Sequence, residues 1–141
     1  MRTRVTGSGM AAAALTAALL AGTLAARAQI TPFDFTGHWT GSATGGKGQV
    51  IPLAADLATG TLPGTFTGMV TLPFRGQDIQ CPVSGKQKRF DKVKIHVTPC
   101  PIGTTLLRGK LDPTAQMITG HYLNVRHGKV HTGPFMLTKE T

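Results

Sequence analysis

The chain is poor in the residues from which most active sites are built. Its 141 residues include six Asp and Glu against fifteen Lys and Arg. After the N-terminal segment the only serines are Ser42 and Ser84; neither lies in a Gly-x-Ser-x-Gly motif, and no His–Asp pair can be placed beside them. The spacing of the few acidic residues does not indicate a glycosidase-type carboxylate pair. The sequence therefore favours a non-enzymatic protein that needs no cofactor.

Cysteine is also scarce, because Cys81 and Cys100 are the only two. Their spacing does not match Cys-x-x-Cys, which argues against a redox-active pair. A metal site usually needs three or four converging ligands, and the five histidines are expected at scattered outward or hairpin positions. We therefore predict no metal site and one disulfide between Cys81 and Cys100.

The uncharged stretch at 10–26 is too short and too rich in Ala for a membrane-spanning helix, which needs about 20 strongly apolar residues. Two arginines precede it, and Ala26-Arg27-Ala28 matches the small-x-small pattern that signal peptidase reads. No Cys lies near this point, which argues against a lipid anchor. We predict a signal peptide at 1–28, a single mature domain at 29–141 without a transmembrane anchor, and a periplasmic or extracellular location.

Helical signal is almost absent from the mature chain. Gly and Pro recur every few residues, and Val, Ile, Thr, Phe and Leu fall in short alternating runs, which is typical of strands. Eight short strands joined by short loops favour an all-β, antiparallel up-and-down barrel, because closure removes both exposed edges; a β-sandwich is the alternative. The expected strands lie at about 34–43, 48–57, 62–72, 77–86, 92–98, 104–111, 116–126 and 130–139.

The last two runs can be paired residue by residue. If Gly128-Lys129 is a two-residue turn, Gly at its first central position suits type II′. Tyr122 then faces Phe135, and both point to the core side of the sheet. Nearer the turn the same face becomes polar, because it carries Asn124, Arg126 and His131, with Arg126 directly opposite His131.

The first run contains Gly37-His38-Trp39, which resembles the Gly-x-Trp opening of the calycin barrels, the lipocalins and avidins. Leu107-x-Gly109-x-Leu111 is similar to the strand rhythm of small bacterial lipocalin-like domains. In those families the Trp closes one end of the barrel, so the resemblance implies that Trp39 is a plug. It also implies a small-ligand cavity, without a particular ligand. The Arg that often packs over the lipocalin Trp is missing from the last strand, where Lys139 is the nearest substitute.

Together these patterns predict an exported binding protein that holds a small amphipathic or anionic ligand in a barrel cavity. The cavity should open at the end that bears the loops 44–48, 73–77, 99–103 and 127–130, opposite Trp39. An Arg fork suits a carboxylate or phosphate, while apolar side chains contact the rest of the ligand. The expected ligand-binding residues are Tyr122, Asn124, Arg126 and His131.

A basic stretch at 86–94 is the strongest local charge signal. Alternation places Lys92, Lys94, Arg108 and Lys110 on the outer face, with Lys94 opposite Arg108 and Lys92 opposite Lys110. Like charges in such pairs are mildly destabilising, which an anionic partner would offset; solvated side chains that splay apart are the alternative. The second functional hypothesis is therefore an interaction protein, a hydrolase inhibitor or an envelope polyanion binder, that acts through its exterior or loops. Few exterior aromatics argue against nucleic acid.

Overall fold

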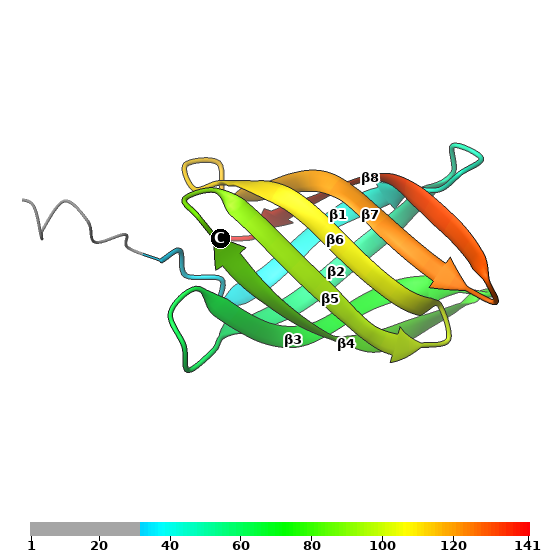
Figure 1. Ribbon diagram of the computed structural model, residues 1–141, viewed down its shortest axis with the longest axis horizontal. Helices are drawn as coiled ribbons and strands as arrows, with labels where there is room; N and C mark the ends of the chain where they lie inside the picture. Colours follow the sequence, from blue (N-terminus) through cyan, green and yellow to red (C-terminus); the bar gives the residue numbers. More distant parts are fainter. Residues whose placement is uncertain (1–31) are drawn as a thin grey trace, which may run out of the picture. The chain divides into compact units, whose positions relative to one another are not determined.

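The computed structural model describes residues 32–141, which form a closed barrel of eight antiparallel strands (Figure 1). Each strand pairs with its neighbours in sequence, and β8 pairs with β1 to close the barrel. The predicted up-and-down barrel is thus confirmed, and the β-sandwich is excluded. The strands are β1 (Gly37–Thr44), β2 (Val50–Thr59), β3 (Thr65–Phe74), β4 (Gln77–Lys88), β5 (Lys92–Cys100), β6 (Gly103–Asp112), β7 (Met117–Arg126) and β8 (Lys129–Lys139).

The signal peptide predicted at 1–28 and the expected first residues of the mature chain lie outside the described residues. Within residues 32–141, no helix is long and apolar enough to cross a membrane.

The strands form where apolar and polar side chains alternate. In β5, Val93, Ile95 and Val97 are buried inside the barrel, while Lys92 and His96 are exposed. Each buried Val or Ile side chain contributes roughly 1.5–3 kcal/mol through the apolar surface that it removes from water. This gain fixes which face of each strand points inward, because a shift by one residue would expose the whole apolar set.

The first strand begins three residues later than the pattern predicted. The carboxylate of Asp34 accepts a hydrogen bond from the backbone N–H of Thr36, at 2.9 Å, and this turn delays the start of β1 until Gly37. The turn also directs the ring of Phe35 into the core, where it is fully buried. Asx turns of this kind compete with strand pairing, which explains the difference.

Aromatic side chains close the end of the barrel at which β1 begins. Trp39 is fully buried, and its indole Nε1 donates a hydrogen bond to the carbonyl oxygen of Phe35 at 2.9 Å. The ring of Phe35 stacks on that of Phe66, with centroids 4.2 Å apart, and Phe33 packs edge-on against Phe35. Lys139 covers this aromatic plug: its Nζ lies 5.5 Å from the centre of the Phe33 ring. We call these four aromatic residues the plug.

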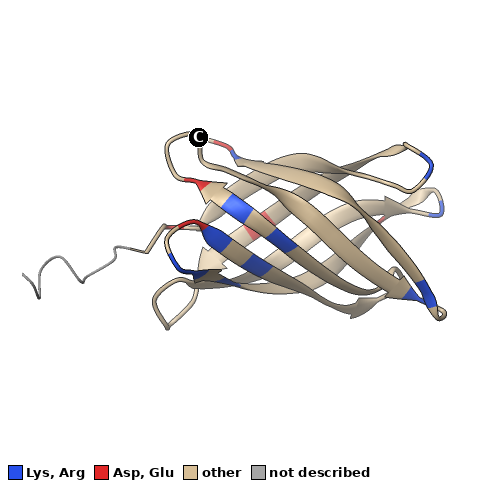
Figure 2. Ribbon diagram, turned by 45° about the horizontal axis from the view of Figure 1, so that its top comes forward, with Lys and Arg blue, Asp and Glu red and all other residues tan. Residues whose placement is uncertain are grey.

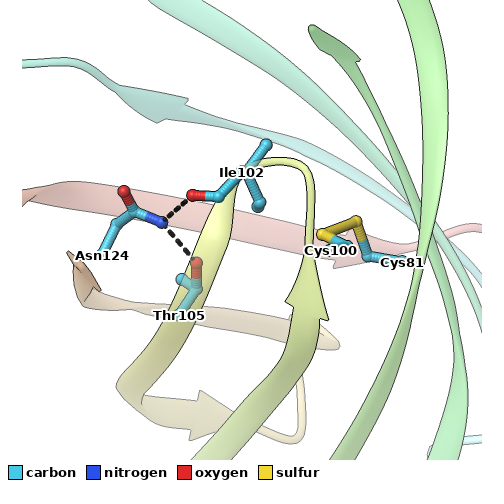
Figure 3. Close-up of a disulfide and its surroundings, with 5 residues drawn as sticks. All are labelled: Cys81, Cys100, Ile102, Thr105 and Asn124. Carbon is cyan, nitrogen blue, oxygen red and sulfur yellow. Dashed lines mark hydrogen bonds between the residues drawn. A yellow bond between two sulfur atoms is a disulfide. The ribbon is translucent and has the colours of Figure 1, made fainter. Parts of the chain in front are cut away.

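Cys81 of β4 and Cys100 of β5 form the predicted disulfide, with their Cα atoms 6.0 Å apart (Figure 3). The β4–β5 ladder extends only as far as the pair of Val83 and Val97, so the covalent bond joins the two strands beyond it. A disulfide of this kind is typical of proteins that fold in an oxidising, extracellular-type environment.

The β7–β8 hairpin corrects one sequence-based prediction. Arg126 pairs with Lys129, so the two turn residues are His127 and Gly128, not Gly128 and Lys129. Their φ angles are 51° and 73°, which is the double positive φ of a type I′ turn, and His tolerates this conformation better than most residues. The predicted type II′ turn was therefore wrong. The register error is two residues, an even number, so the inward face is the one that the pattern indicated.

Candidate functional site

The barrel encloses a cavity of about 360 Å³. One of its lining residues, Phe66, belongs to the plug, so the plug forms the base of the cavity. Residues from the β1–β2 loop and from the ends of β3 and β7 surround the mouth at the opposite end. The wall between them is aliphatic and consists of Ala43, Ile51, Leu53, Ala55, Leu57, Val70, Leu72, Val83, Ile95, Val97, Leu107 and Leu137.

The size of this space limits what it can hold. At the roughly 30 Å³ that one water molecule occupies in the liquid, the cavity has room for on the order of a dozen non-hydrogen atoms. It is also within the usual range for small-molecule sites, about 300–1,000 Å³. The side chains of the wall therefore do not fill the barrel, and the space between the plug and the mouth is open.

Asn124 of β7 is held rigidly in the wall near the mouth. Its Nδ2 donates to the carbonyl oxygen of Ile102 and to the hydroxyl of Thr105, both at 2.8 Å (Figure 3). These bonds satisfy the buried Thr105 and fix the orientation of the amide group. Both use the nitrogen, so the amide oxygen takes no part in them and can accept a hydrogen bond from a ligand.

Tyr122 of β7 is partly buried, and its hydroxyl donates to the carbonyl oxygen of Thr44 in β1 at 2.8 Å. The ring reaches β1 by crossing β8 at Gly133, where a Cβ atom would lie 3.0 Å from the Tyr122 hydroxyl. Burial raises the pKa of Tyr122, so the hydroxyl is neutral and remains a donor. Since that donor is already used, Tyr122 offers a ligand mainly the face of its ring.

Arg126 extends across the mouth. Its Cζ lies 5.3 Å from the centre of the Phe74 ring, and the Cζ of Arg75 lies 5.0 Å from the same ring. β3 and β7 are four strands apart in a closed barrel of eight, so they lie on opposite sides of it. Of the described residues that line the cavity, none is Asp or Glu. The guanidinium is therefore a cation at the mouth with no carboxylate beside it in the lining.

His131 also lies at the mouth, where it is exposed and pairs with Asn124 across the β7–β8 ladder. The prediction that it faces Arg126 directly was wrong, because the turn lies one residue earlier than expected and the partner of each β8 residue therefore shifts by two. The structure nevertheless brings all four predicted ligand-binding residues to the cavity lining. Sequence reasoning missed Phe74, Thr105 and Phe66; only the position of Phe74 beside a turn could have suggested a role at the mouth.

Other candidate residues lie away from the cavity. Trp39 belongs to the plug and is not among the lining residues. Lys92, Lys94, Arg108 and Lys110 lie on the outer wall, in the two cross-strand pairs that alternation predicted. No group of three or more His, Cys, Asp or Glu that could hold a metal ion occurs in the part of the chain that the structure describes.

The architecture is consistent with a lipocalin-like barrel: eight strands in up-and-down order, with a buried Trp at the closed end and a cavity above it. Comparison with known proteins adds no relative, since no protein-family model matches the chain and no curated protein matches it in sequence.

Proposed function

We propose that this protein is a non-enzymatic carrier that holds one small, mostly apolar molecule with an anionic head group. The observation that carries the proposal is the open interior, whose wall is aliphatic and whose mouth bears Arg126. Small-molecule sites commonly combine a large apolar surface with a few polar groups that fix orientation. The guanidinium fork suits a carboxylate or phosphate, and a ring N–H of His131 offers a second donor at the mouth.

In this proposal the protein is a calycin-type barrel that acts in the periplasm or outside the cell. The Gly37-x-Trp39 opening and the eight-stranded barrel support the first part. The predicted signal peptide and the Cys81–Cys100 disulfide support the second.

Calorimetric titration with decanoate tests the carrier, because decanoate is about as large as the cavity allows and carries one carboxylate. We expect binding at one site, and about tenfold weaker binding to Arg126→Gln, which corresponds to about 1.4 kcal/mol. Lys94→Gln removes one positive charge from the outer wall and should bind like the wild type. Decanol has no charge and should bind wild type and Arg126→Gln equally.

Two outcomes would contradict the proposal. If neither decanoate nor decanol binds the wild-type protein, the cavity is not a site for such molecules. If Arg126→Gln and Lys94→Gln weaken decanoate binding equally, the effect is general electrostatic attraction.

A second pair of variants tests the location of the ligand. Val97 of β5 lines the cavity, whereas the next residue, Thr98, is exposed on the outer wall. Val97→Phe should abolish binding of both decanoate and decanol by filling the cavity, and Thr98→Phe should bind both normally. The reverse result would place the ligand outside the barrel.

The alternative function, an interaction protein that acts through its basic exterior, depends on a different surface. The relevant basic residues lie on the outer wall of β4–β6, and none of them lines the cavity.

A further inference from the structure

The outer wall of β4–β6 carries six positively charged side chains near the plug end. Figure 2 shows Lys and Arg in blue side by side on neighbouring strands. The strand registers arrange them in two rows of three, in which each residue pairs with the next across a ladder. We call this surface the basic face; its rows are Lys86–Lys94–Arg108 and Lys88–Lys92–Lys110.

The charges of the basic face are not neutralised within the barrel. Among residues 32–141 the ion pairs join His38 to Asp56 and to Glu140, and none involves the basic face. Like charges directly opposite each other in a sheet are destabilising. The basic face contains four such pairs, two across each ladder. Their repulsion lowers the stability of the barrel, and an anionic partner would remove this repulsion.

Part of the basic face borders a shallow, open hollow in the outer surface. Lys88, Lys92, Lys94, Arg108 and Lys110 line a hollow of about 650 Å³ that extends to His121 on β7. Its lining also includes Gly109 and Gly120, which pair across β6 and β7. A Cβ on Gly109 would meet Ile118 and the Phe135 ring inside the barrel, so these glycines allow β6 and β7 to pack closely over Phe135 beneath the hollow. The hollow therefore has five cationic side chains around it.

An exposed aromatic side chain lies beside the basic face. Phe90, at the tip of the β4–β5 turn, is 74% exposed, and both Arg89 and Phe90 have positive φ angles, 29° and 39°. The carboxamide of Gln87 donates to the carbonyl oxygen of Phe90 and accepts from the backbone N–H of Phe33. The turn that presents Phe90 is therefore fixed to the plug end.

A second apolar side chain protrudes at the same end. Leu62, in the β2–β3 loop, is 68% exposed. This loop lies beside the end of β4, because the backbone N–H of Gln87 donates to the carbonyl oxygen of Gly64 at 2.7 Å. Two exposed apolar side chains thus accompany the six cations.

We propose that the basic face, with Phe90 and Leu62, binds the surface of a membrane that contains anionic lipids. Lipid phosphates would contact the cations and the hollow, while the two apolar side chains enter the interfacial layer. Basic residues combined with exposed aromatic and aliphatic side chains are typical of interfacial binding. A soluble polyanion would use the cations but would gain little from Phe90 and Leu62, so the apolar pair favours the lipid surface.

This geometry leaves the carrier site free. The basic face is near the plug end, whereas the cavity opens at the opposite end. A barrel docked in this way could exchange a ligand through its mouth while it remained on the membrane. The membrane proposal does not depend on the carrier proposal, because the two use different residues.

Vesicle co-sedimentation tests membrane binding with phosphatidylcholine vesicles that contain or lack phosphatidylglycerol. We expect binding only with phosphatidylglycerol, and weaker binding as salt is raised. Lys94→Gln/Arg108→Gln should bind about thirtyfold more weakly, since each basic residue near an anionic surface contributes a several-fold gain. The matched control is Lys47→Gln/Lys129→Gln, which removes the same charge at the mouth end and should bind like the wild type.

A second comparison separates a lipid surface from a soluble polyanion. Phe90→Ser should weaken vesicle binding several-fold, whereas Val130→Ser, which changes a side chain 62% exposed at the mouth end, should not. Neither should alter binding to polyphosphate. If Lys94→Gln/Arg108→Gln and Lys47→Gln/Lys129→Gln weaken vesicle binding equally, the proposal is overturned, because net charge alone then explains the binding. Vesicle binding that is unaffected by Phe90→Ser would overturn it in favour of a polyanion site.

Discussion

Arg126 and Phe74 meet across the mouth of the barrel, with the guanidinium carbon 5.3 Å from the centre of the ring. The two side chains come from β7 and β3, which lie on opposite sides of the barrel. A cation–π contact at an exposed site contributes about 0.5–1 kcal/mol, which is enough to hold a side chain over an opening but not enough to lock it. Arg126 is therefore placed to cover the mouth and to turn toward an anionic head group.

The first prediction concerns this contact. Phe74→Ala removes the ring that holds Arg126, so decanoate should associate about two- to fivefold faster, in line with the loss of a contact of that size. The association rate of decanoate can be measured by stopped-flow competition with an environment-sensitive anionic dye. An unchanged rate with weaker equilibrium binding would show instead that Phe74 is part of the binding wall.

The second prediction concerns the plug. Trp39→Ala should lower the free energy of unfolding by about 3–5 kcal/mol, because it leaves a cavity in a fully buried aromatic cluster and removes the bond to Phe35. Trp39→Phe keeps an aromatic ring and should cost less. Urea denaturation measures both, and an unchanged midpoint for Trp39→Ala would show that the plug adds nothing to stability.

The third prediction concerns the disulfide. Cys81→Ser/Cys100→Ser should lower stability by about 3 kcal/mol, because the bond closes a loop with a sequence separation of 19 residues. In a domain of this size the melting temperature should fall by on the order of ten degrees. Thermal melts of the oxidised wild type and the variant give the comparison. The reduced wild type should match the variant; if it melts like the oxidised protein, the bond is not a stabilising element.

The fourth prediction concerns pH. His38 Nδ1 lies 2.7 Å from Asp56 Oδ1, and this hydrogen bond is the main cause that raises the pKa of His38 above its usual value. Because the pKa of His38 is raised in the folded state, the interaction of protonated His38 with Asp56 stabilises the fold. This contribution is fully present below about pH 6.5, the pKa of an unfolded His. That contribution is lost as the pH rises through the folded-state pKa.

NMR titration of His38 provides the measurement. Asp56→Asn should lower the pKa of His38 and remove its share of the pH-dependent stability, whereas Asp78→Asn, in β4, should change neither. A His38 titration that does not move in Asp56→Asn would show that the hydrogen bond is absent in solution.

Local patterns were sufficient to predict most of the barrel. The alternation of apolar and polar residues predicted which side chains of β5 and β6 point inward. An antiparallel register that joins these faces predicted the observed pairing of Lys94 with Arg108. The disulfide followed from the cysteine count and the expected export. In each case the deciding information lies within one strand or between adjacent strands, where side-chain period and turn residues act directly.

Features that depend on closure were not predictable in this way. The contact of Arg126 with Phe74 joins strands four apart, and no pattern within either strand specifies it. The β7–β8 turn was misplaced because its first residue, His127, adopts a positive φ that Gly or Asn would have signalled more clearly. Lys86 and Lys88 became part of the basic face only through the β4–β5 register, which the sequence did not indicate.

The order of the strands also determines how the barrel can assemble. Seven of its eight ladders join strands that are adjacent in sequence, whereas the β1–β8 ladder pairs Trp39 with Lys139. Loop-closure entropy grows with the length of chain enclosed, and contacts between distant segments slow folding. The hairpins can therefore form one after another, with β1–β8 closure as the last step. A chain synthesised from its N-terminus must keep one edge of β1 unpaired until β8 has emerged, and during that interval this edge is open to pairing with another chain.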